Sequence, residues 1–166
     1  MLNILKTRNG VSLIELVVTV TILAILAAGI VPLTRMTAQR TKEIELRRNL
    51  RIIRIAIDDF KNKCDKVPAN LPPPDSCLPN KYPKKLEDLL EGTDFGDTKA
   101  GKIKFLRRKI YDPFHPPESD RDDMWGWNLR SSVDKSDSNI WGKEDVFDVY
   151  SLSEGTALDG TKYKEW

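Results

Sequence analysis

The first feature of the chain is a long apolar stretch close to its beginning. From Val11 to Leu33 the sequence reads VSLIELVVTVTILAILAAGIVPL, and Glu15 is its only ionisable residue. Because an α-helix rises about 1.5 Å per residue, about 20 apolar residues cover the roughly 30 Å of a bilayer core. The pattern therefore predicts a membrane-spanning helix over residues 11–33.

A second periodic pattern follows at residues 34–62. Apolar side chains recur there at spacings of four, three, four and three residues, which places them on one face of a helix, and charged side chains fill the opposite positions. The first helix is therefore predicted to continue as an amphipathic helix that packs one face against a folded domain. The predicted inward stripe consists of Leu46, Leu50, Ile53, Ile57 and Phe60.

Residues 63–166 predict a small α+β domain. A short helix is expected over Pro83–Glu91, with Pro near its start and Gly92 as its stop. Three short runs separated by Pro, Gly, Asp and Ser clusters have the character of strands in an antiparallel sheet, and one long helix packed on such a sheet gives an α+β fold. The predicted strands are Lys104–Ile110, Trp125–Arg130 and Val146–Leu152.

The charge of the chain is balanced but unevenly placed. Charged residues make up 31% of the 166 residues, and the formal net charge is +2. Residues 1–10 hold two of the 27 basic side chains, so the remainder has 25 basic and 25 acidic side chains. A balanced body gives no electrostatic case for nucleic acid as a partner. Most of the charge lies beyond residue 34, which is the layout of an anchor followed by a water-soluble domain.

Glu15 separates three interpretations of the apolar stretch. A secretory signal peptide would be cleaved after Ala28 or Gly29, and a plain anchor would be retained whole. In the third interpretation a short leader is cleaved before the stretch, between Gly10 and Val11. A carboxylate in a membrane helix costs on the order of 2.5–3.5 kcal/mol, so it needs a partner or a function. Only the third cleavage creates an α-amine four residues before Glu15, on the same helix face, in its own chain or a neighbouring one.

The residues around this position resemble the cleavage and methylation motif of type IV prepilins. Lys-Thr-Arg-Asn-Gly10 is followed by Val-Ser-Leu-Ile-Glu15, with an apolar first mature residue and Glu at the fifth. The resemblance implies that a membrane aspartyl peptidase removes residues 1–10 and N-methylates Val11, where the family usually has Phe. It also implies a pilin-like fold in which Pro32 bends the helix. The expected parts are a leader at 1–10, a filament-core helix at 11–33, its amphipathic continuation at 34–62 and a globular domain at 63–166.

Several segments of the C-terminal half resemble the G-type, or major, pseudopilins of type II secretion. They are Phe105–Arg108, Asp112-Pro113, Trp125-Gly126, Arg130-Ser131 and the final residues 144–166. The resemblance implies a structural subunit, not an enzyme, of a filament that pushes folded substrates through an outer-membrane channel. Implied partners are further copies of the chain, other pseudopilins, the prepilin peptidase, the inner-membrane secretion platform and, before assembly, membrane lipid. The implied location is the bacterial inner membrane, with a cytoplasmic leader and a periplasmic or extracytoplasmic domain.

Two other functions compete with this interpretation. The chain could be a type IV pilus or competence pilin, although those often carry a disulfide near the C-terminus. It could also be a membrane-anchored binding module that never polymerises and uses its four tryptophans and the acidic run at residues 118–123 to hold a sugar or calcium. Packing of the tryptophans in the core and a solvated loop at 118–123 are the simpler interpretations.

The resemblance to G-type pseudopilins also raises calcium as a candidate cofactor, because members often bind it in a C-terminal loop. Calcium takes roughly six to eight oxygen ligands from carboxylates and carbonyls. The candidate ligands are the Leu152 carbonyl, Glu154 and Asp159, whereas Lys162 and Lys164 lie close in sequence and disfavour the site. The alternative is a loop closed by turns, with no metal.

Cys64 and Cys77 flank a Pro-rich segment and form a candidate disulfide. The chain-entropy model credits a loop of this size with roughly 3 kcal/mol, and the alternative is two free thiols. The remaining polar residues give no case for catalysis, since the single His115 has no nucleophile in a motif context. Candidates for ion pairs between subunits are Glu43, Glu45, Arg47 and Arg48.

Overall fold

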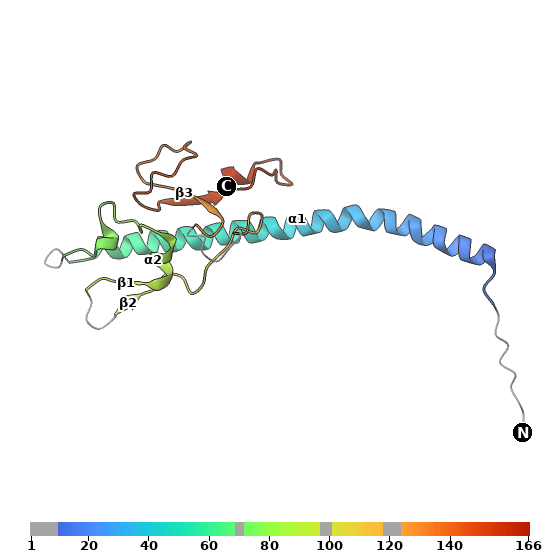
Figure 1. Cartoon of the computed structure of the whole chain (residues 1–166), viewed down its shortest axis with the longest axis horizontal. Coiled ribbons are helices and arrows are strands. Elements are labelled where there is room, and N and C mark those ends of the chain that lie inside the picture. Colours follow the sequence, from blue (N-terminus) through green and yellow to red (C-terminus); the bar gives the residue numbers. More distant parts are fainter. Residues whose placement is uncertain (1–9, 69–71, 97–100, 118–123) are drawn as a thin grey trace, which may run out of the picture. The chain divides into compact units, whose positions relative to one another are not determined.

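The computed structural model describes residues 10–68, 72–96, 101–117 and 124–166, apart from the side chains of residues 29, 31 and 32. The chain divides into an N-terminal unit, residues 1–40, and a C-terminal unit, residues 41–166. Of the predicted leader, only Gly10 lies within the described residues. The elements (Figure 1) are α1 Leu13–Asp65, η1 Asp75–Cys77, α2 Leu86–Glu91, β1 Thr93–Asp94, β2 Lys102–Ile103, β3 Trp127–Arg130, β4 Asp148–Ser151 and η2 Tyr163–Glu165.

Helix α1 begins directly after Ser12. The N–H of Leu16 donates to the Ser12 carbonyl at 3.0 Å, which closes the first turn. The helix then runs to Asp65 without a break, so the two helical patterns of the sequence form one element, as predicted. Helical backbone continues through the position of Pro32, whose side chain lies outside those that the structure describes, so its predicted bend stays a prediction.

The predicted inward stripe of α1 forms the core of the C-terminal unit. All five of its residues are at most 3% exposed, which confirms that this face packs on a folded domain. Phe60 meets Phe95 and Phe105 edge-on, with ring centroids 5.8 and 5.4 Å away. Such pairs contribute about 0.5–1.5 kcal/mol beyond the burial of their area. Trp125 and Trp127 are fully buried in the same core.

Helix α2 begins three residues later than predicted because the backbone before it forms hydrogen bonds with another part of the chain. The carbonyl of Pro83 accepts a hydrogen bond of 2.7 Å from the N–H of Val146. The carboxylate of Asp88 then accepts the N–H of Lys85 at 3.0 Å, which caps the first turn. The helix stops before Gly92, as predicted, and the φ of +87° at this residue suits glycine.

The described residues of the C-terminal unit form two small antiparallel sheets in place of the single sheet predicted. Strand β1 pairs with β2, and β3 pairs with β4. Strands β3 and β4 lie within two of the predicted strands, but the predicted strand Lys104–Ile110 is wrong. The N–H groups of Phe105 and Leu106 both donate to the carbonyl of Leu89 in α2, at 2.9 and 2.8 Å. This backbone therefore satisfies the exposed end of a helix and does not pair with a strand.

A disulfide joins the end of α1 to η1. The sulfur atoms of Cys64 and Cys77 are 2.05 Å apart, and the Cα atoms are 5.7 Å apart. Both residues are at most 5% exposed and belong to the core of the C-terminal unit. The disulfide therefore fixes the Pro-rich segment to the last turns of the long helix.

Candidate assembly helix and processing site

The candidate cleavage position lies just before α1. Gly10 and Val11 belong to no helix or strand, and the side chain of Val11 is 71% exposed. Open space surrounds Gly10, because a Cβ atom placed there would meet nothing within 4 Å. A peptidase can therefore reach the main chain at this bond without first unwinding a helix.

Glu15 occupies the first turn of α1. Its side chain is exposed, and within the described part of the chain it has no hydrogen bond or ion pair. Carboxylates near a helix N-terminus interact favourably with the helix dipole, typically by about 0.3–1 kcal/mol. Sequence reasoning missed Ser12, although the spacing Ser12-x-x-Glu15 is that of a capping box and marks the start of the helix.

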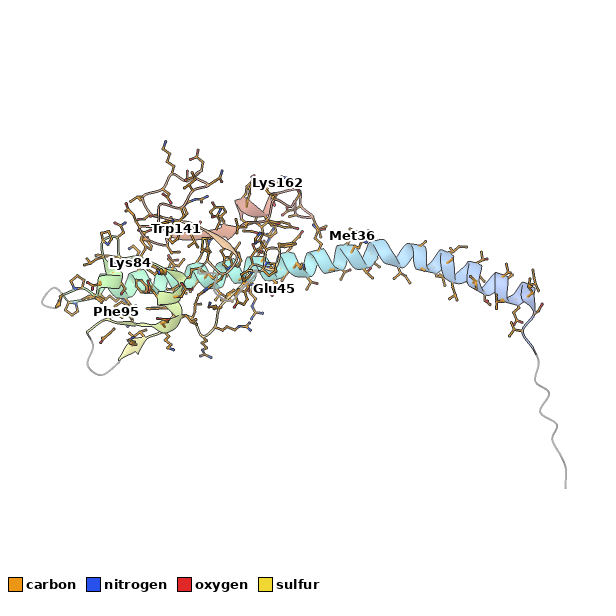
Figure 2. The ribbon with its side chains drawn as sticks, viewed as in Figure 1. Met36, Glu45, Lys84, Phe95, Trp141 and Lys162 are labelled. Carbon is orange, nitrogen blue, oxygen red and sulfur yellow. A yellow bond between two sulfur atoms is a disulfide. The ribbon has the colours of Figure 1, made fainter. Side chains whose placement is uncertain are left out.

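The surface of α1 that follows Glu15 is apolar and uncovered. The large apolar side chains from Val11 to Leu33 that the structure describes are 48–80% exposed. An 18-residue window of this helix is long and apolar enough to cross a membrane, and none of the window is buried in the protein. Figure 2 shows side chains leaving both sides of this part of the ribbon.

The polar side chains within this apolar surface are satisfied by the helix itself. The hydroxyl of Thr19 donates to the Leu16 carbonyl at 2.9 Å, and that of Thr21 donates to the Val17 carbonyl at 2.7 Å. Satisfied hydroxyls cost little in an apolar environment. Glu15 is thus the one charge that this surface presents.

Comparison with known proteins identifies the same region. Residues 5–31 match the family model described as the prokaryotic N-terminal methylation motif. The chain carries this N-terminal methylation motif. The match includes Gly10, Val11 and Glu15, and it ends one residue before Pro32. Such a motif is a type IV pilin-like prepilin signal and implies processing by a prepilin peptidase. No curated protein and no solved structure matches the chain.

In the C-terminal unit, Glu43 binds the C-terminal segment to α1. Its buried Oε1 accepts hydrogen bonds from the N–H of Leu158 and the hydroxyl of Tyr163, both at 2.9 Å. Sequence reasoning assigned Glu43 to ion pairs between subunits, and the structure instead gives it these partners within the chain. Those partners lie more than 110 residues away, so no local pattern reveals them.

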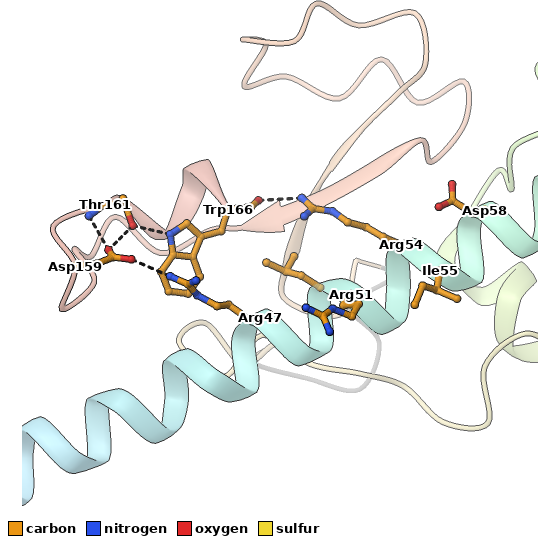
Figure 3. A pocket seen from close by; sticks show the side chains of 9 residues that line it. Arg47, Arg51, Arg54, Ile55, Asp58, Asp159, Thr161 and Trp166 are labelled. Atoms are coloured by element: carbon orange, nitrogen blue, oxygen red, sulfur yellow. Dashed lines mark hydrogen bonds and ion pairs between the residues drawn. The ribbon is translucent and has the colours of Figure 1, made fainter.

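Two arginines of α1 make further contacts with the same segment (Figure 3). Arg47 pairs with Asp159 at 2.8 Å, and its guanidinium lies 4.0 Å from the ring centroid of Trp166. Arg54 donates to Asp148 at 2.7 Å and to the main-chain oxygen of Trp166 at 2.9 Å. Arg47, a second candidate for pairs between subunits, is thus engaged within its own chain.

The two acidic candidates for calcium ligands, Glu154 and Asp159, have other partners. A hydrogen bond from the Thr161 hydroxyl and, after it, the Arg47 guanidinium hold the pKa of Asp159 below its usual value. Glu154 pairs with Lys164 at 3.5 Å. Among the described residues, no group of three or more His, Cys, Asp or Glu side chains could hold a metal ion. The calcium site that the resemblance implies therefore stays a prediction.

The indole N–H groups of the four tryptophans form hydrogen bonds within the C-terminal unit. Trp125 and Trp127 are buried, and their indole N–H groups donate to Glu87 and to the Ile110 carbonyl, both at 2.8 Å. The other two indole N–H groups donate to main-chain or side-chain oxygens of the C-terminal unit. These contacts fit a role in packing. The acidic run at 118–123 lies outside the described residues.

Proposed function

We propose that this chain is a structural filament subunit, which assembles through its N-terminal helix after residues 1–10 are removed. The observation that carries the proposal is the coincidence of the methylation motif with a helix whose apolar surface is uncovered. Such a surface is stable in lipid or against other apolar helices. Cleavage between Gly10 and Val11 keeps the surface intact and adds a charged amine at its end.

Glu15 supplies the specific contact in this proposal. The helix dipole offsets about 0.3–1 kcal/mol of the cost of a carboxylate, whereas that cost reaches on the order of 2.5–3.5 kcal/mol at the bilayer centre. A cation beside Glu15 would offset the cost that remains. The α-amine of Val11 on a neighbouring subunit is such a cation, and N-methylation preserves its charge. Pairing of Glu15 with that amine would register each subunit against the next.

The finer assignment is to the pseudopilins of type II secretion. It is supported by the resemblance of residues 105–166 to G-type members, and it distinguishes a short periplasmic filament from a surface pilus. In this proposal the subunit waits in the inner membrane with its C-terminal unit in the periplasm. The prepilin peptidase, the secretion platform and other pseudopilins are its partners.

The proposal is tested by a substitution that removes the charge of Glu15, together with a matched control. Glu15→Gln keeps the shape of the side chain, and Asp59→Asn changes an exposed carboxylate further along the same helix. Each variant is co-expressed with a prepilin peptidase, and both N-terminal processing and sedimentable filament are measured. Loss of a charge-assisted contact worth about 1.5–3 kcal/mol predicts that Glu15→Gln reduces filament yield roughly tenfold or more.

The measurement of N-terminal processing distinguishes the possible outcomes of this test. The proposal expects Glu15→Gln to be cleaved and membrane-embedded but poorly assembled, while Asp59→Asn assembles like the wild type. Equal filament yields from both variants would remove the role of Glu15. A wild-type chain that is cleaved yet never assembles would favour the anchored binding module.

A further inference from the structure

Arg130 on β3 is a largely buried cation whose Nε has no hydrogen-bond partner among the described residues. Its side chain is 21% exposed, and within the described residues its Nε is shielded from solvent and has no hydrogen-bond partner. Its ion pair with Asp148 is long, at 4.0 Å between Nη1 and Oδ2. Taking a charge out of water costs several kcal/mol, so buried guanidinium groups are normally paired closely.

Arg130 lacks a close ion pair because Arg54 already binds the nearby carboxylate of Asp148. Arg54 Nε donates to Asp148 Oδ1 at 2.7 Å, and Nη2 also donates to the Val149 carbonyl at 3.1 Å. The guanidinium of Arg130 stacks over the Tyr150 ring, with Cζ 4.7 Å from the centroid. Stacking positions the plane of the guanidinium and uses none of its N–H groups as hydrogen-bond donors.

Tyr150 on β4, beside Arg130, also has a buried polar atom without a partner among the described residues. The residue is 4% exposed, and its hydroxyl has no hydrogen-bond partner in the described part of the chain. Arg130 and Tyr150 both line an open cavity of about 620 Å³ within the C-terminal unit. Two unsatisfied donors at one cavity are unusual, because buried polar groups are nearly always paired.

We propose that this cavity binds a single carboxylate group. Arg130 Nε and one Nη form the two-pronged donor that matches two carboxylate oxygens, and the Tyr150 hydroxyl is a third donor. Lys164 also lines the cavity and adds positive charge. Asp137, Asp148 and Glu165 line it as well, and their repulsion disfavours a doubly charged phosphate.

The carboxylate has two possible sources, a free small acid or an acidic group of a second copy of the chain. The site lies wholly within residues 130–166 and α1, so it does not depend on the proposed filament function. A filament could form without it, and it could bind a ligand in an unassembled chain.

The test is a titration of the full chain in detergent micelles, followed by NMR of the indole N–H of Trp166, a residue that also lines the cavity. Sodium propionate is the probe at constant ionic strength, with sodium chloride as reference and inorganic phosphate as competitor. We expect a saturable propionate shift, weakened about tenfold or more by Arg130→Lys, which keeps the charge but loses the fork. Tyr150→Phe weakens binding about fivefold, and the exposed control Arg107→Lys leaves it unchanged.

A dilution series of the protein without added acid distinguishes the two sources of the carboxylate. A Trp166 signal that moves with protein concentration identifies a second copy as the donor of the carboxylate, and a signal that moves only with propionate identifies a free acid. A linear, unsaturable response would overturn the proposal. The same conclusion follows if Arg130→Lys binds propionate as well as the wild type, or if phosphate binds equally well.

Discussion

Single carboxylates connect distant parts of the C-terminal unit. Glu43 joins α1 to the C-terminal segment, and the buried Asp112 accepts the hydroxyl of Ser151 on β4. Burial raises the pKa of Asp145, but hydrogen bonds from the side chain and main chain of Ser132, with others, outweigh it and leave that pKa below its usual value. The unit therefore relies on carboxyl oxygens as acceptors for its own N–H and O–H groups.

The contact of Glu43 predicts a specific loss of stability. Glu43→Ala leaves the Leu158 N–H and the Tyr163 hydroxyl without their acceptor, which should lower the free energy of unfolding by about 2 kcal/mol. Denaturant unfolding followed by tryptophan fluorescence measures this, because all four tryptophans lie beyond residue 124. Glu45→Ala, an exposed change two residues away, is the control and should shift the midpoint little. Equal midpoints for the two variants would contradict the role of Glu43.

A second prediction concerns the pKa of Asp65 at the end of α1. Hydrogen bonds from Lys61 and then Lys81, both 2.8 Å long, lower this pKa to about 2. Because the folded pKa lies below the unfolded one, the stability that Asp65 contributes is present above about pH 4 and is lost as the pH falls toward 2. Carboxyl NMR titration should show that Lys61→Met raises the pKa of Asp65 more than Lys81→Met does. An Asp65 that titrates near 4 in the wild type would refute this assignment.

At the scale of helices and strands, sequence patterns predict the features that depend on local interactions. The inward stripe of α1, the stop at Gly92 and the strands β3 and β4 follow from periodicity and turn residues. The segment Lys104–Ile110 has the composition of a strand, but its backbone is held by the carbonyl of Leu89 in α2. Which partner a backbone finds depends on tertiary contacts, so this segment and the division into two sheets were beyond sequence patterns.

The disulfide between α1 and η1 predicts a measurable stabilisation. Cys64 and Cys77 are separated by 13 positions, and closing a loop of this size restricts the unfolded chain by roughly 3 kcal/mol. The double variant Cys64→Ser/Cys77→Ser should therefore unfold at lower denaturant concentration than the wild type. Reductant should lower the wild-type midpoint toward that of the variant and leave the variant unchanged. A reductant-insensitive wild type would show that the bond contributes nothing to stability.

At the scale of the whole molecule, the chain has an N-terminal helical segment whose apolar surface is exposed and a C-terminal unit with its own hydrophobic core. The sequence predicted both parts, because an apolar run with one charge and an amphipathic stripe are local signals. It did not predict the cavity beside Arg130 and Tyr150. That cavity requires the pairing of β3 with β4 and the capture of Asp148 by Arg54, which are contacts between residues far apart in sequence.

Processing of the N-terminus tests the central claim most directly. The full chain is co-expressed with an active prepilin peptidase or with an inactive one, and intact mass and N-terminal sequencing define the product. We expect the active peptidase to yield a chain that lacks residues 1–10 and begins with N-methylated Val11, while the inactive one leaves the chain whole. A chain that stays uncut with the active peptidase, or that is cut after Ala28 or Gly29, would contradict the account of this protein as a processed filament subunit.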